Sequence, residues 1–195
     1  MDDLICKIKS LLELGYEGGY WDFKSDYPDK NKKEDKLHDI ICMANNLEDR
    51  DAYLIYGAND DGTIKGIQNT EKQRLKTADF IKFLRDKNFA GGFIPDVELQ
   101  TIVIDDNELD ILIIRRGKHT PYYLQKDYYE SSPKEKLRAG AIYTRTADIN
   151  TPKECTARRI SNSKEQFYYS LIENERLKDM EIFNVLKEKY MDFYN

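Results

Sequence analysis

The 195-residue sequence is poor in the residues that would build a disulfide framework, a zinc site or a membrane span. Its three cysteines, Cys6, Cys42 and Cys155, lie far apart and form no C-x-x-C pair, which favours reduced thiols in a cytosolic protein. No stretch approaches eighteen consecutive apolar residues, and the N-terminal segment lacks the basic start and apolar core of a signal peptide. The sequence therefore predicts a cytoplasmic protein without a membrane span.

Positive charge is also in short supply. The chain has 31 Lys and Arg against 36 Asp and Glu, which gives a net charge of −5. Because affinity for phosphate comes from Lys and Arg, this balance disfavours nucleic-acid binding by the molecule as a whole. The basic residues are clustered at 30–36, 115–118 and 158–159, however, and local patches can bind phosphate on an acidic protein. The two histidines, His38 and His119, have no Ser or Cys partner at a recognisable spacing, so a hydrolase triad has no support.

The sequence does contain enough apolar and aromatic residues to fold, at 40% and 12%. Apolar residues at helical spacing predict helices over 3–14, 34–46 and 71–87, and one or two more over 163–195. Alternating or short apolar runs predict strands at 20–24, 52–58, 63–67, 97–104, 109–115 and 141–146. We therefore expect an α+β fold with a mixed, mostly antiparallel sheet and flanking helices. This domain is predicted at 1–160, and a C-terminal helical extension at 161–195.

Two acidic residues, Glu17 and Asp22, lie on either side of a Gly-Gly pair at the start of the first predicted strand. On a continuous strand, residues five apart would point to opposite faces. The two glycines permit a turn or bulge that would bring Glu17 back toward Asp22. Lys24 shares the face of Asp22 and could contact a phosphate. The alternative is a solvated strand end with a salt bridge to Lys24.

Four phrases of the sequence occur in an order that is more specific than any one of them. They are EGGYWDFK at 17–24, HDIICMANN at 38–46, YLIYGANDDG at 53–62 and GAIYTRTADINTP at 140–152. Together they resemble the Schlafen-type, AlbA-like domain of many bacterial proteins and of animal Schlafens, over about residues 13–157. The resemblance implies a compact α+β domain associated with nucleic acid.

In the Schlafen members that cut RNA, three carboxylates hold a divalent metal, and the resemblance places Glu17, Asp22 and Asp60 at those positions. It implies Mn²⁺ or Mg²⁺ as cofactor, since both prefer hard oxygen ligands, and a metal-dependent endoribonuclease acting on structured, tRNA-like RNA. One departure is Asp22, where the cutting members carry Glu. Asp61 is an equal structural candidate for the third acid, and Asn-Asp-Asp-Gly is also good hairpin-turn chemistry.

The predicted nucleic-acid contacts are basic residues near these acids or in the basic clusters: Lys24, Lys32, Lys33, Arg115, Arg116 and Arg145. Arg145 belongs to a Tyr-x-Arg phrase that the resemblance makes a phosphate contact, although an arginine in a strand is more often an ion-pair partner. RNA is favoured over DNA as the partner. Two alternatives remain open. One is a non-catalytic DNA- or RNA-binding module of a transcription regulator or phage-defence system, and the other is an interaction domain that forms a homodimer through its helical tail.

Overall fold

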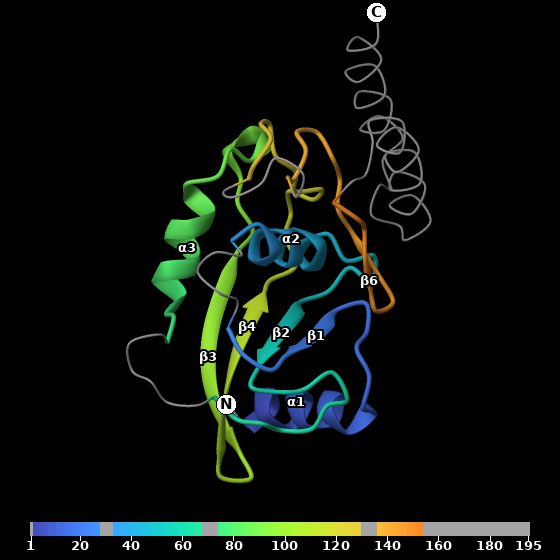
Figure 1. The fold of residues 1–195 in the computed structure, drawn as a ribbon, viewed down its shortest axis with the longest axis vertical. Helices are drawn as coiled ribbons and strands as arrows, with labels where there is room; N and C mark the ends of the chain where they lie inside the picture. The colour runs from blue at the N-terminus through green and yellow to red at the C-terminus, as the bar shows by residue number, and fades with distance from the viewer. Residues whose placement is uncertain (1, 28–32, 68–73, 130–135, 154–195) are drawn as a thin grey trace, which may run out of the picture. The chain divides into compact units, whose positions relative to one another are not determined.

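The computed structural model describes residues 2–27, 33–67, 74–129 and 136–153 (Figure 1). Its elements follow in the order α1 (Asp2–Leu14), β1 (Trp21–Lys24), α2 (Lys33–Ala44), β2 (Ala52–Tyr56), α3 (Thr77–Arg85), η1 (Ala90–Gly92), β3 (Val97–Ile104), β4 (Asn107–Ile114), β5 (Arg145–Thr146) and β6 (Ile149–Asn150). Lys33 is the first residue of α2. Lys32 and the predicted extension at 161–195 lie outside the described residues.

The central sheet has four strands in the order β1-β2-β4-β3. β1 pairs with β2 in parallel, and α2 lies between these two strands in the sequence, as a parallel connection requires. The pairs β2–β4 and β3–β4 are antiparallel, and β5 and β6 form a separate hairpin. The predicted α+β fold with a mixed, mostly antiparallel sheet is therefore confirmed.

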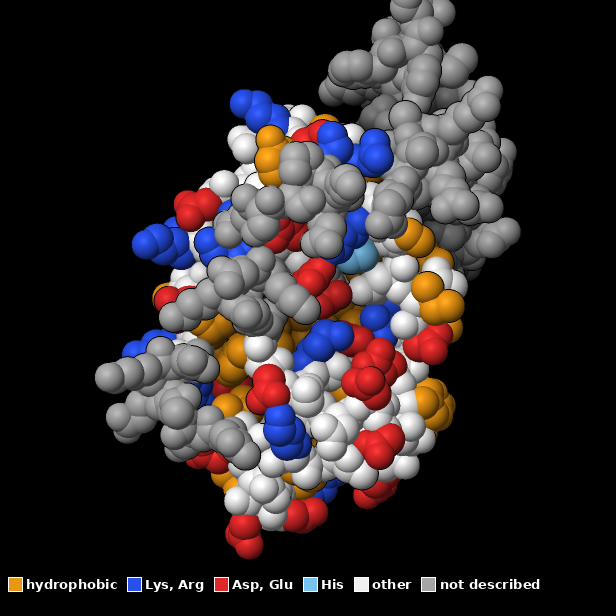
Figure 2. All heavy atoms as spheres, in the orientation of Figure 1, with side chains coloured by type: hydrophobic (Ala, Val, Ile, Leu, Met, Phe, Trp, Pro, Cys, Tyr) orange, Lys and Arg blue, Asp and Glu red, His pale blue; other side chains and the backbone are white. Residues whose placement is uncertain are grey.

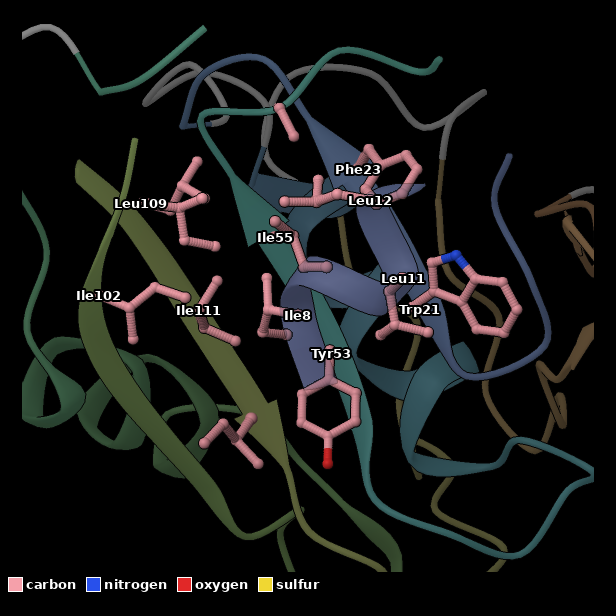
Figure 3. Packing of buried hydrophobic residues seen from close by; sticks show 13 residues of the cluster. Ile8, Leu11, Leu12, Trp21, Phe23, Tyr53, Ile55, Ile102, Leu109 and Ile111 are labelled. Carbon is pink, nitrogen blue, oxygen red and sulfur yellow. The ribbon is translucent and has the colours of Figure 1, made fainter. Parts of the chain in front are cut away.

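One face of the sheet packs against α1 in the main hydrophobic core (Figure 3). Side chains alternate along each strand, so every second residue points to this face. The buried residues of the core are Ile8, Leu11 and Leu12 of α1, with Trp21, Phe23, Tyr53, Ile55, Ala58, Ile102, Ile104, Leu109, Ile111 and Ile113. Packing of α1 on this apolar face fixes the register of the strands, because a one-residue slip would turn these side chains to the opposite face of the sheet.

The other residues of the same strands are buried as well. α2 contacts β2 and β4, and α3 contacts β3. Leu54 and Leu112, which alternate with the residues of the α1 core, are at most 1% exposed. Asp22 and Asp110 also belong to this alternate set, so two carboxylates lie among apolar side chains. Each therefore needs a compensating partner.

Three predicted elements differ most from the structure, and each is shorter than expected. α3 begins at Thr77, because Asp79 accepts a hydrogen bond from the backbone N–H of Lys76 and caps the helix there. The return strand at 63–67 is reduced to a single bridge between Ala58 and Ile64. The strand at 141–146 is limited to β5, since the carbonyl of Tyr143 accepts a hydrogen bond from a side chain and not from a neighbouring strand.

Candidate functional site

The Gly-Gly pair before β1 forms a tight turn that folds the chain back on itself. The N–H of Gly18 donates to the carbonyl of Trp21 at 3.1 Å. A Cβ on Gly18 would lie 2.2 Å from Cη2 of Trp21, so only glycine fits against the indole ring. Beyond the turn, Oε1 of Glu17 accepts a hydrogen bond from the N–H of Phe23 at 3.0 Å. The prediction that the glycines return Glu17 to Asp22 is confirmed.

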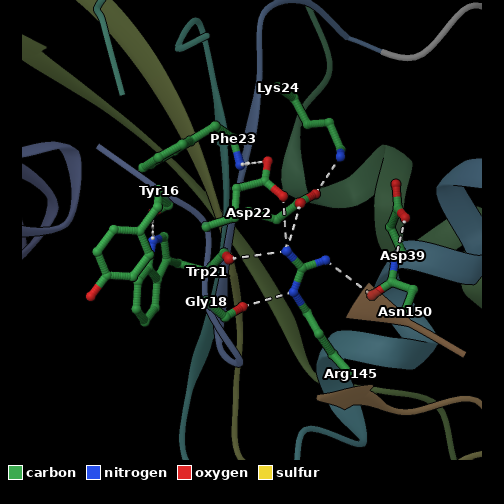
Figure 4. A network of polar contacts seen from close by, with 10 residues as sticks. Tyr16, Gly18, Trp21, Asp22, Phe23, Lys24, Asp39, Arg145 and Asn150 are labelled. Atoms are coloured by element: carbon green, nitrogen blue, oxygen red, sulfur yellow. Dashed lines mark hydrogen bonds and ion pairs between the residues drawn. The ribbon is translucent and has the colours of Figure 1, made fainter. Parts of the chain in front are cut away.

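Arg145, from β5, holds the two carboxylates together (Figure 4). Its Nη2 lies 3.0 Å from Oε2 of Glu17 and 3.0 Å from Oδ1 of Asp22. Its Nε donates to the carbonyl of Gly18 at 2.7 Å, and its Nη1 donates to Oδ1 of Asn150 at 3.0 Å. All three guanidinium nitrogens therefore have acceptors. The side chain is 2% exposed, which places the charge inside the protein.

Two more charged residues, Lys24 and Asp39, complete the group, and the neutral Asn150 connects Asp39 to Arg145. Lys24 forms an ion pair with Oδ2 of Asp22. Asn150 donates through Nδ2 to Oδ1 of Asp39 at 3.0 Å, and so connects α2 to Arg145. We call Glu17, Asp22, Lys24, Asp39, Arg145 and Asn150 the arginine cluster. It joins β1 and α2, which are near each other in the sequence, to the β5–β6 hairpin, and the contacts across it span 123 and 111 residues.

Burial changes the proton affinities of these carboxyl groups. Desolvation, together with the hydrogen bond to Asp22 and its charge, raises the pKa of Glu17 to about 7. Desolvation alone would raise the pKa of Asp22, but the charge of Lys24, the hydrogen bond to Glu17 and the charge of Arg145 lower it below its ordinary value. Desolvation raises the pKa of Asp39 to about 6. The cluster therefore holds an ionised Asp22 beside carboxyl groups that keep their protons more readily.

This arrangement does not fit a divalent metal. The oxygens of Asp22 contact Arg145 and Lys24, and those of Glu17 contact Arg145 and the N–H of Phe23. Mn²⁺ or Mg²⁺ needs several open oxygen ligands and keeps bound waters. The guanidinium already supplies the positive charge between the two carboxylates. A metal would have to displace Arg145, whose side chain is 2% exposed.

Comparison with known proteins places the chain in a family. The family model described as "Schlafen, AlbA_2" matches residues 17–154. The chain belongs to the Schlafen AlbA_2 family. Membership associates it with nucleic acid, in agreement with the resemblance of the four sequence phrases. No curated protein matches the sequence.

One solved structure is similar to this AlbA_2 chain at low sequence identity. The crystal structure of the DIP2311 protein from Corynebacterium diphtheriae is similar over 77% of the chain, with 18% sequence identity and a TM-score of 0.45. The matched part is 26% of that protein, so the chain spans about a quarter of its length.

The third acid expected of a cutting AlbA_2 domain is not brought to the other two. Asp60 is exposed in the turn that follows β2. Its neighbour Asp61 accepts hydrogen bonds from the N–H and hydroxyl of Thr63 at 2.9 and 2.6 Å, which is turn chemistry. Across the ranges that the structure describes, no three His, Cys, Asp or Glu residues form a group that could hold a metal. The predicted three-carboxylate site is thus not assembled here.

Two other predicted nucleic-acid contacts, Arg115 and Arg116, are engaged in ion pairs but remain more accessible than Arg145. Arg115 bonds to Asp51 at 2.9 Å and to Glu98 at 2.7 Å, and its side chain is 40% exposed. Arg116 pairs with Asp49 at 2.6 Å and is 59% exposed. Such surface pairs contribute little energy, so a phosphate can compete for these arginines. Arg145, in contrast, is 2% exposed and bonded within the arginine cluster, and its expected role as a phosphate contact stays a prediction.

Sequence reasoning missed Asp39 and Asn150 as members of the cluster. Asn150 follows the last predicted strand, at 141–146, and Asp39 lies on the predicted helix at 34–46 with other acidic residues. A usable signal was their position inside two of the four family phrases. His38, next to Asp39, is 7% exposed, and its Nε2 lies 2.8 Å from the carbonyl of Thr151, as befits a structural histidine.

Proposed function

We propose that this AlbA_2 domain binds nucleic acid and does not cut it with a metal ion. Family membership supports the first part. The observation that carries the second is the guanidinium of Arg145, which lies within 3.0 Å of both Glu17 and Asp22. The cluster then acts as an internal clamp that ties β1, α2 and the β5–β6 hairpin together.

Phosphate contacts come, in this proposal, from the cations that solvent can reach. Arg116 and Arg115 follow β4, and their side chains are 59% and 40% exposed. Lys24 is 34% exposed while it pairs with Asp22. Neutralising a few phosphates in this way gives moderate, salt-sensitive affinity even though the net charge is −5.

A gel-shift and cleavage experiment on one labelled, tRNA-like RNA tests this proposal. The full chain is incubated with the RNA in Mn²⁺, in Mg²⁺ and in EDTA. We expect a shifted band in all three and intact RNA throughout. Cleavage that EDTA abolishes, and that an Asp22→Ala variant also loses, would instead establish the metal-dependent endoribonuclease. Absence of any shift at low salt would remove nucleic-acid binding itself.

The preference for RNA and the homodimer are finer proposals within the same function. A DNA oligonucleotide of matched sequence in the gel-shift experiment tests the first, and RNA is expected to bind more tightly. Light scattering of the full chain at micromolar concentration tests the second, and a monomer would contradict it. No helix in the described part of the chain is long and apolar enough to cross a bilayer.

A further inference from the structure

Two aromatic rings form an exposed stack at one end of the central sheet. The rings of Phe93 and His119 lie 3.8 Å apart between centroids, with an angle of 8° between their planes. Phe93 precedes β3 and His119 follows β4. These positions meet because β3 and β4 are antiparallel, with Val97 opposite Ile114. The main core and the arginine cluster use neither ring.

Both rings keep a large part of their surface in solvent. The Phe93 side chain is 49% exposed, and His119 is also exposed. One face of each ring covers the other, so the exposed surface of the pair lies on outer faces and edges. An exposed, flat aromatic surface of this kind is available for stacking by a third planar group.

The segments that carry the rings are held by backbone contacts. The N–H of Ala90 donates to the carbonyl of Tyr123 at 2.9 Å, and the N–H of Arg115 donates to that of Asp96 at 2.9 Å. Gly91 has a φ of +68°, and a Cβ there would lie 3.0 Å from Cδ2 of Phe93, so glycine permits both the turn and the ring position. A stack ordered in advance loses little entropy when a ligand binds.

Positive charge lies next to the stack in the sequence. Lys118 immediately precedes His119, is exposed, and forms no ion pair with any residue the structure describes. Arg116 is three residues from His119 and is 59% exposed. A flat aromatic surface with cations one and three residues away in the sequence matches the chemistry of a base joined to its phosphates. An apolar protein segment would use the rings but not the cations.

We propose that the Phe93–His119 stack binds an unpaired base of a single-stranded nucleic acid, while Lys118 and Arg116 contact the neighbouring phosphates. This inference rests on the proposed function and deepens it, because it names single strands as the preferred substrate. Bases inside a duplex are already stacked on both sides and cannot offer a face to the rings. Stacking is tolerant of sequence, so RNA and DNA single strands should both use this surface.

Fluorescence anisotropy of the full chain in EDTA, with labelled single-stranded RNA and DNA and a hairpin duplex, tests the proposal. Phe93→Ala should weaken binding of both single strands by roughly 5- to 150-fold, the range for loss of one base–aromatic stack. Duplex binding should be weaker at the outset and change little. Phe93→Trp keeps an aromatic ring at this position, so it should retain the affinity that Phe93→Ala loses. The fluorescence of the introduced tryptophan should be quenched when a base binds.

Val103→Ala is the matched control. Val103 is an exposed apolar residue, at 54%, and lies near the far end of β3, roughly 20 Å along the strand from Val97. The Val103→Ala variant should bind single strands and duplex with the same affinities as the unaltered chain. Equal affinities of the Phe93→Ala and Val103→Ala variants for single strands, or equal losses on single strands and duplex, would overturn the stacking site. If the unaltered chain binds neither the single strands nor the duplex, the failure lies with the proposed function and not with the stack.

Discussion

Replacing Arg145 with Met tests whether the arginine cluster is a clamp. Methionine keeps most of the side-chain length but removes the charge and every N–H donor. It would leave Asp22, at 2% exposure, with Lys24 as its remaining cationic contact, and would leave the Gly18 carbonyl without its donor. Removing one partner of a buried ion pair costs about 3–5 kcal/mol. For a domain of this size, that corresponds to a lowering of Tm by roughly 6–20 °C.

Urea denaturation followed by far-UV circular dichroism and by Trp21 fluorescence measures the loss. Trp21 reports locally, because its Nε1 donates to the carbonyl of Tyr16 at 2.8 Å beside the cluster. Asp22→Asn in the Arg145→Met background removes the buried charge that has lost its guanidinium partner, so the double variant should be more stable than the sum of the two single losses predicts. We expect a coupling energy of about 1–3 kcal/mol.

Two controls sharpen this prediction. Arg116→Met breaks a surface pair with Asp49, and it should cost less than about 1 kcal/mol. Arg145→Lys keeps the charge but not the planar set of donors, so it should fall between the native chain and Arg145→Met. An Arg145→Met variant as stable as Arg116→Met, or strictly additive losses at Asp22 and Arg145, would refute the clamp.

Three further outcomes follow from the geometry. Protonation of Glu17 stabilises the folded state; this contribution is complete below its ordinary pKa of 4.5 and is lost as the pH rises to about 7. Glu17→Gln should therefore flatten the fall in the urea midpoint over this interval. Parallel curves of urea midpoint against pH for the variant and the native chain would contradict this prediction. Gly18→Ala places a methyl group against Trp21 and should cost about 1–3 kcal/mol in the same denaturation assay, whereas an unchanged midpoint would show that the turn is loose. Asp60→Ala, on an exposed turn, should change stability by less than about 0.5 kcal/mol and leave RNA retention in the gel-shift assay unaltered; loss of a Mn²⁺-dependent activity would contradict this.

The fold was largely predictable, because its strands carry strong local patterns. The run at 52–58 is apolar throughout and became β2, which is buried along its whole length. The strands predicted at 97–104 and 109–115 correspond to β3 and β4, which pair as a hairpin, and Asp105 and Asp106 between them adopt positive φ. The Gly18-Gly19 turn was predictable for the same reason, since glycine pairs signal a local change of direction.

The site was less predictable, because its partners are distant in the sequence. Arg145 and Glu17 are 128 residues apart, and no periodicity relates them. From the sequence alone, an arginine in a strand is expected at the surface. The burial of Arg145 follows from the packing of α2 and the β5–β6 hairpin, which the sequence does not show. The family pattern aligned three acids, but it could not show that an arginine from a fourth segment fills the space between two of them.

Titration of the full chain with Mn²⁺, followed by electron paramagnetic resonance of the unbound ion, tests the central claim most directly. With Arg145 between Glu17 and Asp22, we predict that the native chain and the Asp22→Ala variant leave the same fraction of Mn²⁺ unbound at every concentration. One tightly bound Mn²⁺ per chain that disappears in Asp22→Ala would show that the two carboxylates serve a metal and not the arginine.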